Sequence, residues 1–307
     1  MNKVPLFESL RSIAKDIEKK NMSPVEITKY YLGRLHKLGS EYNSVVTVTE
    51  QLALDQAAIA EKEIMNGNYK GLLHGIPFGA KDLLATKYGI PTTWGAEPFR
   101  NQIFEYNSTV IEKLCDSGAV LVAKLAMIEL AGGMGYRQPN ASLTGPCKSP
   151  WDKNTWAGGS SSGSGSAVGT GLVPFSIGSE TWGSILSPAN NCGVSGLRPT
   201  YGRVSRYGAM ALSWSLDKIG PLCLSADDCG IVLEHISGPD SRDPSASDNI
   251  YAYNHDMPER PFKIAVLSDA TLNADSEVSN NFQHSLQTLG QFCDIEEIDL
   301  PEYPYEA

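Results

Sequence analysis

The chain has no apolar run close to the roughly 20 residues that span a membrane, and it begins without a secretory signal. Its 6 cysteines show neither a paired framework nor a Cys-x-x-Cys metal spacing, which indicates reduced thiols in a cytoplasmic protein without a metal or other cofactor. Basic residues are also few. The formal net charge of −10 disfavours direct binding to nucleic acid or to an anionic membrane. At 307 residues, 41% of them apolar, the chain can still bury a substantial core, and we expect a soluble enzyme.

Small residues are concentrated in one part of the chain. Residues 158–166 read Gly-Gly-Ser-Ser-Ser-Gly-Ser-Gly-Ser, and residues 178–184 form a second serine-bearing turn, Gly-Ser-Glu-Thr-Trp-Gly-Ser. By composition alone the first run is equally typical of a flexible linker. Apolar residues 167–177 follow it at once, however, and indicate the start of a buried helix and a strand. The pattern therefore favours serines held on close-packed turns, an arrangement suited to nucleophilic catalysis.

A serine nucleophile needs a base that accepts its proton, and the best candidate is Lys81 in the segment Gly-Ile-Pro-Phe-Gly-Ala-Lys-Asp, residues 75–82. A lysine is usually a solvated surface charge. Lys81 follows an apolar stretch and precedes Asp82-Leu83-Leu84, which favours a partly buried ammonium. Burial is required for this role, because the pKa of about 10.4 of a lysine in water must fall before the amine is neutral.

A different serine-hydrolase motif is also present, because residues 159–163 fit Gly-x-Ser-x-Gly with Ser161 at the centre. That motif needs a preceding strand and an acid and a histidine later in the chain. Residues 148–156 read as a loop, and His235, His255 and His284 have no distinctive context. A phosphate-binding loop has less support, since no Gly-Lys-Ser/Thr follows the glycines.

Together, these segments resemble the amidase signature family of Ser-Ser-Lys hydrolases. Residues 75–82 reproduce its Gly-x-Pro-x-x-x-Lys-Asp motif, and Ser160 and Ser184 are separated by the 24 residues typical of the family. The resemblance implies that Lys81 accepts a proton from Ser160, and that Ser160 accepts one from Ser184 as Ser184 attacks an amide. It further implies a cis peptide bond between Gly159 and Ser160.

The resemblance also implies an oxyanion hole formed by backbone N–H groups of Thr181, Trp182, Gly183 and Ser184. Trp182 either shapes the substrate pocket or packs against the protein. Met134 aligns with a substrate-lining position of the family, and core packing is an equally open role for it.

The turn around the nucleophile departs from the commonest family pattern. The commonest pattern has Asp where this chain has Glu180, Gly where it has Trp182, and Arg-Gln where it has Leu186-Ser187. This chain instead resembles a subgroup that includes bacterial peptide amidases. The orienting role of the arginine must therefore be missing or replaced.

Residues 197–208 and 215–221 resemble the A subunit of the amidotransferases that act on Glu-tRNA(Gln) and Asp-tRNA(Asn). Such subunits release ammonia from glutamine and pass it to a partner. The nucleophile turn favours an amidase that hydrolyses a small-molecule carboxylic amide through an acyl-enzyme. Two alternatives stay open, a glutaminase subunit of such an amidotransferase and an inactive or partner-binding fragment. The possible partners are a second copy in a homodimer or the other amidotransferase subunits.

The expected fold class is α/β, an α/β/α amidase-signature fold with a mixed central sheet flanked by helices. We expect one domain over residues 1–307, with a helical part at 1–70, a catalytic core at 71–237, a loop at 238–249 and the start of a C-terminal part at 250–307. Family members continue well beyond this point, so we expect the rest of that part to be missing. Helices are predicted from the Ser23-Pro24 capping signal to about Lys37, and at 52–65, 109–116 and 278–289; strands are predicted at 43–49, 119–124 and 262–267.

Overall fold

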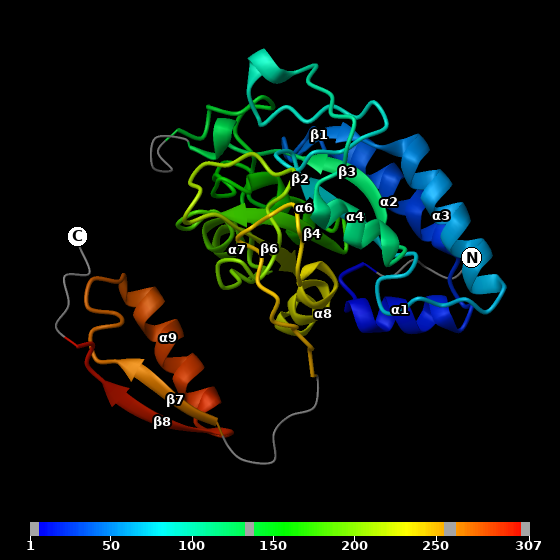
Figure 1. Ribbon diagram of the computed structural model, residues 1–307. Helices are drawn as coiled ribbons and strands as arrows, with labels where there is room; N and C mark the ends of the chain where they lie inside the picture. Colours follow the sequence, from blue (N-terminus) through cyan, green and yellow to red (C-terminus); the bar gives the residue numbers. More distant parts are fainter. Residues whose placement is uncertain (1–5, 133–137, 255–261, 302–307) are drawn as a thin grey trace. The chain divides into compact units, whose positions relative to one another are not determined.

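The computed structural model describes residues 6–132, 138–254 and 262–301 (Figure 1). The chain divides into two compact units, residues 1–253 and residues 254–307.

A mixed six-stranded sheet forms the centre of the first unit. Its strand order is β1-β3-β2-β4-β6-β5. The central strands β3, β2 and β4 are parallel, whereas β1, β6 and β5 pair antiparallel with their neighbours. The strands are β1 (Val45–Val48), β2 (Pro77–Lys81), β3 (Val120–Leu125), β4 (Phe175–Glu180), β5 (Ser195–Gly196) and β6 (Lys218–Cys223).

Helices lie between most of these strands along the chain (Figure 1). Ser23 begins the second helix as predicted, since its hydroxyl accepts hydrogen bonds from the amides of Val25 and Glu26 and Pro24 occupies the first turn. Among the described residues of this unit, the α-helices are α1 (Leu10–Glu18), α2 (Pro24–Leu38), α3 (Glu50–Met65), α4 (Thr109–Asp116), α6 (Ser162–Gly169), α7 (Leu186–Cys192) and α8 (Ala226–Ile236); short 3-10 turns lie at Glu97–Phe99 and Glu129–Ala131.

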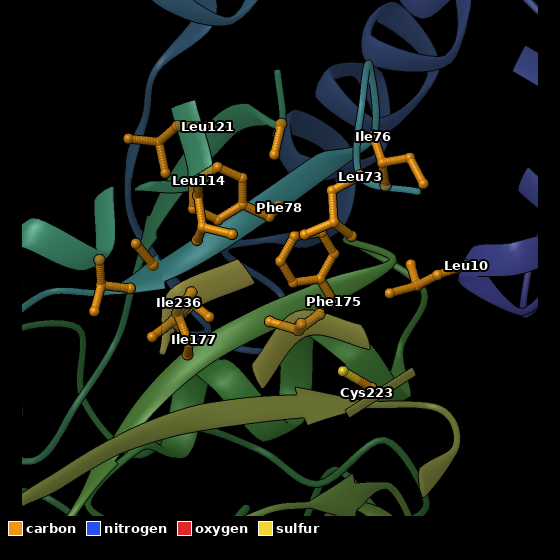
Figure 2. Packing of buried hydrophobic residues seen from close by; sticks show 14 of the residues in the cluster. Leu10, Leu73, Ile76, Phe78, Leu114, Leu121, Phe175, Ile177, Cys223 and Ile236 are labelled. Atoms are coloured by element: carbon orange, nitrogen blue, oxygen red, sulfur yellow. The ribbon is translucent and has the colours of Figure 1, made fainter. Parts of the chain in front are cut away.

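Apolar side chains cover both faces of the sheet. Leu121 of β3 belongs to a core cluster with residues of α1, α4 and α8, whereas Val120 and Val122 pack in a second cluster with residues of α2, α3 and α6. Figure 2 shows the first cluster, in which Phe78 and Phe175 from neighbouring strands stack with ring centroids 5.4 Å apart. Helices thus lie on both faces of a mixed sheet, which confirms the predicted α/β/α fold class.

The parallel pairing of β2 and β4 determines where polar residues meet. Phe78 pairs with Phe175 and Ala80 with Ile177, so the carboxyl ends of both strands lie at one edge of the sheet. Lys81 is the last residue of β2. The neighbouring strand ends at Glu180, and ligands commonly bind at such an edge in α/β sheets.

The Gly/Ser run is packed inside the molecule, so the linker interpretation is wrong. Ser160, Ser162 and Ser164 are at least 99% buried, and α6 begins within the run at Ser162. A Cβ atom added to Gly163 would lie only 2.4 Å from the amide nitrogen of Ala126, just after β3. Small residues are needed here because the first turn of α6 contacts other backbone segments directly.

The second unit contains a β-α-β arrangement, described here for residues 262–301. Strands β7 (Phe262–Leu267) and β8 (Cys293–Ile298) are parallel and are connected through helix α9 (Ser276–Leu289). The predicted strand at 262–267 is confirmed, and the helix begins two residues earlier than predicted. Among the described residues of both units, no helix has the length and hydropathy that a membrane crossing requires.

The close packing of α6 predicts opposite effects for two Gly→Ala substitutions. Gly163→Ala should lower the free energy of unfolding by about 1–3 kcal/mol, because the new methyl group overlaps backbone atoms. Gly33→Ala in α2 should raise it by about 0.5–1 kcal/mol, since Gly33 is exposed with no atom within 4 Å of an added Cβ. Urea unfolding of both variants checks this. A Gly163→Ala variant with the same free energy of unfolding as the wild type would contradict the close packing of α6.

Candidate active site

Lys81 lies at the centre of a cluster of serine hydroxyls. Its Nζ is 2.8 Å from Ser160 Oγ, 2.9 Å from Ser161 Oγ and 2.9 Å from Ser179 Oγ, all hydrogen-bond distances. The side chains of Lys81 and Ser160 are fully buried. The structure therefore brings two of the residues predicted as catalytic into direct contact.

Burial changes the acid strength of Lys81. Removal from water lowers the pKa of Lys81 from 10.5 to about 7, although the carboxylates of Asp217 and Glu180 act in the opposite direction. Hydroxyl groups accept from an ammonium and donate to a neutral amine, so the surrounding serines suit both protonation states of Lys81. A lysine with this pKa can serve as a general base near neutral pH.

Main-chain contacts connect the two serine-bearing turns. The peptide bond between Gly159 and Ser160 is cis, as predicted. The Ser160 carbonyl accepts a hydrogen bond from the Ile128 amide at 3.1 Å, and the Ser161 amide donates to the Ser184 carbonyl at 3.1 Å. Ser184 has 2% of its surface exposed. The backbone thus holds the Ser184 turn against the segment that places Ser160 beside the lysine.

The buried carboxylate of Glu180 holds the turn that follows Ser184. Its Oε2 accepts hydrogen bonds from the amides of Ile185 at 2.7 Å and Leu186 at 2.9 Å. A buried carboxylate needs a partner, and Arg198 Nη1 lies 3.1 Å from Oε1. Position 186 carries Leu, and the guanidinium beside the Glu180 carboxylate comes from Arg198, further along the chain.

The other turn residues predicted to bind the oxyanion are held by different groups. Thr181 Oγ1 donates a hydrogen bond to Asp217 Oδ1, and Asp217 Oδ2 accepts from the amides of Leu212 and Ser213. Asp217 therefore connects the turn before Ser184 to the loop before β6. Trp182 has 77% of its surface exposed, so the interpretation that it packs against the protein is wrong.

Two predicted roles have no test in this geometry. Met134 lies outside the described residues, and the pocket-shaping role of Trp182 stays a prediction. The Gly-x-Ser-x-Gly interpretation gains no support: Ser161 Oγ donates to the Ser179 carbonyl at 3.1 Å and lies beside Lys81. His235 Nδ1 is 2.8 Å from the Ile231 carbonyl of its own helix.

A second buried lysine lies close to the site. Lys124 and Asp82 are both fully buried, with Nζ 3.3 Å from Oδ1. Lys124 Nζ also donates to the Leu84 carbonyl at 2.8 Å and to Thr92 Oγ1 at 2.7 Å. Burial lowers the pKa of Lys124, while the Asp82 charge opposes that shift. This pair accounts for the acidic residue that follows Lys81 in the sequence.

The Ser-Ser-Lys pattern assigns no role to several residues of the site. Ser161 and Ser179 contact Lys81, and both lie in the serine-bearing segments already singled out. Asp217 and Arg198 lie in segments noted only for their family resemblance. In the sequence, each of these residues stands out only as a polar side chain within an apolar or glycine-rich motif. That pattern does not show which side chains it contacts in the folded protein.

Solved structures with the same fold include an amidase family protein from Bacillus anthracis, with a TM-score of 0.87 and 28% identity over 96% of this chain and 61% of that chain. Native peptide amidase from Stenotrophomonas maltophilia has a TM-score of 0.83 and 26% identity over 95% of this chain and 62% of that chain. Both similarities define an α/β protein of the amidase type.

The model of the family described as Amidase matches residues 26–306, and the chain belongs to this family. The A subunit of glutamyl-tRNA(Gln) amidotransferase from Methylococcus capsulatus is 41% identical over 241 residues, which are 78% of this chain and 49% of that protein. The chain spans about half to three-fifths of the length of the curated relatives that it matches.

The lowered pKa of Lys81 predicts a pH-dependent stability difference between the wild-type chain and Lys81→Met. Between about pH 7 and pH 10.5, the unfolded wild-type chain binds a proton on Lys81 that the folded chain does not. The free energy of unfolding of the wild type, relative to Lys81→Met, should therefore rise by about 1.4 kcal/mol per pH unit in that window and stay constant below it. Urea unfolding from pH 6 to pH 9 measures this difference, and a constant value from pH 7 to pH 9 would show that Lys81 stays protonated.

Proposed function

We propose that the chain carries the catalytic centre of an amidase that cleaves the C–N bond of a carboxylic amide through an acyl-enzyme on Ser184. The observation that carries the proposal is Lys81, fully buried, 2.8 Å from Ser160 Oγ and with a pKa lowered to about 7. Membership of the amidase family supports the same reaction class.

In the proposed reaction, neutral Lys81 accepts the proton of Ser160 while Ser160 accepts the proton of Ser184. The Ser184 oxygen forms a bond to the amide carbon, and the carbonyl oxygen becomes an oxyanion. The C–N bond then breaks, and the proton returns through Ser160 to the leaving ammonia or amine. Water attacks the acyl-enzyme by the same route, giving the carboxylic acid and free Ser184.

Backbone N–H groups of residues 181–184 are the proposed oxyanion hole. Glu180 binds the amides of Ile185 and Leu186, so the carboxylate holds the turn through amides that lie after Ser184. Donors aimed at a developing charge lower the barrier because they need no reorientation during the reaction. We place the catalytic centre in residues 71–237 and treat residues 1–70 and 250–307 as parts of the same amidase domain.

A second candidate function is that of the glutaminase in a tRNA-dependent amidotransferase. The relatives of 37–41% identity, which are A subunits of glutamyl-tRNA(Gln) amidotransferase, favour it. The turn with Glu180, Trp182 and Leu186 favours the stand-alone amidase. The partners differ accordingly: amidotransferase subunits in one case and a second copy of the chain in the other. All 6 cysteines are free thiols, which is compatible with a cytoplasmic location of the protein.

A fluorophosphonate probe tests for the nucleophile. The Ser184 oxygen should displace fluoride from phosphorus and add one probe mass to the chain, at a rate that rises with pH through about 7 as Lys81 becomes neutral. Intact-mass spectrometry should find no adduct on Ser184→Ala or Lys81→Ala. The exposed-site controls Ser40→Ala and Lys62→Ala should label like the wild type. Circular dichroism establishes that every variant is folded, and an adduct retained by folded Ser184→Ala contradicts the proposal.

Ammonia release distinguishes the two candidate functions. We expect the chain alone to hydrolyse simple carboxylic amides, with activity lost in Ser184→Ala. Release of ammonia from glutamine only after addition of the other amidotransferase subunits would instead identify the glutaminase. A coupled ammonia assay with and without those subunits makes the comparison.

A further inference from the structure

Each carbonyl oxygen of residues 181–184 accepts a hydrogen bond from a group outside those four residues. The donors, in order along the turn, are Lys218 Nζ at 2.9 Å, Arg198 Nη1 at 3.4 Å, the Ser187 amide at 2.8 Å and the Ser161 amide at 3.1 Å. The first two donors are cationic side chains from other parts of the fold. Lys218 is the first residue of β6, and Arg198 follows β5.

The hydrogen bonds to the Thr181 and Trp182 carbonyls determine the direction of the two N–H groups that follow them. In a planar trans peptide the C=O and the following N–H point in opposite directions. Because Lys218 binds the Thr181 carbonyl, the Trp182 N–H is directed away from Lys218. Arg198 binds the Trp182 carbonyl and in the same way directs the Gly183 N–H away from itself. These two amides belong to the proposed oxyanion hole.

We propose that Arg198 and Lys218 are positioning residues that orient the Trp182 and Gly183 amides for oxyanion binding. The inference rests on the proposed amidase function. Neither side chain touches the reacting atoms in this arrangement, because each acts through the peptide group that lies between it and the amide. Charge-assisted hydrogen bonds to the carbonyls are stronger than neutral ones and hold the peptide planes more firmly.

The surrounding charges support this arrangement. Arg198 is anchored by Glu180, whose Oε1 lies 3.1 Å from Nη1. Burial lowers the pKa of Lys218, the nearby Arg198 lowers it further, and the carboxylates of Glu180 and Asp217 oppose both. Two cations and two carboxylates thus contact or adjoin one turn. The same two carboxylates are the charges that act on Lys81.

Hydrogen–deuterium exchange tests the orientation without relying on activity. Arg198→Met and Lys218→Met keep an apolar side chain but remove the N–H donors. We expect the peptide covering residues 180–186 to exchange about tenfold faster in each variant, equivalent to the loss of about one hydrogen bond. Arg203→Met is the control, since Arg203 donates to the Asn249 carbonyl at 3.0 Å, and its exchange in this peptide should match the wild type. Wild-type exchange in both test variants overturns the proposal.

The rate of fluorophosphonate labelling tests the consequence for catalysis. The plateau rate at high pH, where Lys81 is neutral in every variant, should fall about ten- to a hundredfold in Arg198→Met and in Lys218→Met, whatever shift in the pH midpoint the loss of a nearby cation causes. A moved midpoint with an unchanged plateau would mean that these residues act on Lys81, and it would overturn the proposal.

Conservative variants separate positioning from folding. Arg198→Lys and Lys218→Arg each keep a cationic donor and should recover part of the plateau rate lost in the Met variants. If the Met variants do not fold, Arg198→Lys and Lys218→Arg test the proposal instead. Wild-type exchange of the 180–186 peptide in these two variants, combined with a plateau labelling rate far below that of the wild type, overturns the proposal. Absence of labelling in the wild type itself counts against the amidase function, while the exchange measurement still decides the orientation.

Discussion

The site depends on keeping the Lys81 ammonium out of water. Desolvation is the largest effect on the Lys81 pKa, and it outweighs the attraction of two nearby carboxylates. That balance requires both carboxylates to be occupied elsewhere. Glu180 binds two backbone amides and Arg198, and Asp217 binds Thr181 and two further amides. The small residues of α6 pack directly against backbone of other segments, and none of them carries a charge.

The two buried lysines lie in different surroundings, and only those of Lys81 suit the proposed base. Lys124 faces the carboxylate of Asp82 directly, at 3.3 Å, and such a pair is costly to break from either side. Lys81 is surrounded by the hydroxyls of Ser160, Ser161 and Ser179, which accommodate a neutral amine as readily as an ammonium. Asp82 follows Lys81 in sequence, yet its ion pair is with Lys124. Sequence adjacency therefore misidentifies the partner of the acidic residue.

What the sequence predicts is local. The Ser23-Pro24 signal places the start of α2, and the bounds of α4 match residues 109–116, because caps and helical periodicity depend on near neighbours. Family resemblance supplies Lys81 and the cis peptide. The contacts of Lys81 with Ser161 and Ser179 join residues 80 and 98 positions apart and exist only once β2 and β4 pair. No pattern along the chain predicts contacts between residues so far apart in sequence. The two serines therefore stand out as part of a motif, but their contact with Lys81 could not be predicted.

The turn around Ser184 takes its neighbouring cation from a distant segment of the chain. Position 186 carries Leu, and the buried carboxylate of Glu180 needs a cationic partner from elsewhere in the fold. Arg198 meets that need from the segment after β5, and the same Nη1 also reaches the Trp182 carbonyl. One cation therefore serves both the buried carboxylate and the peptide plane. A change at position 198 therefore acts on the charge of the site and on the direction of its amides together.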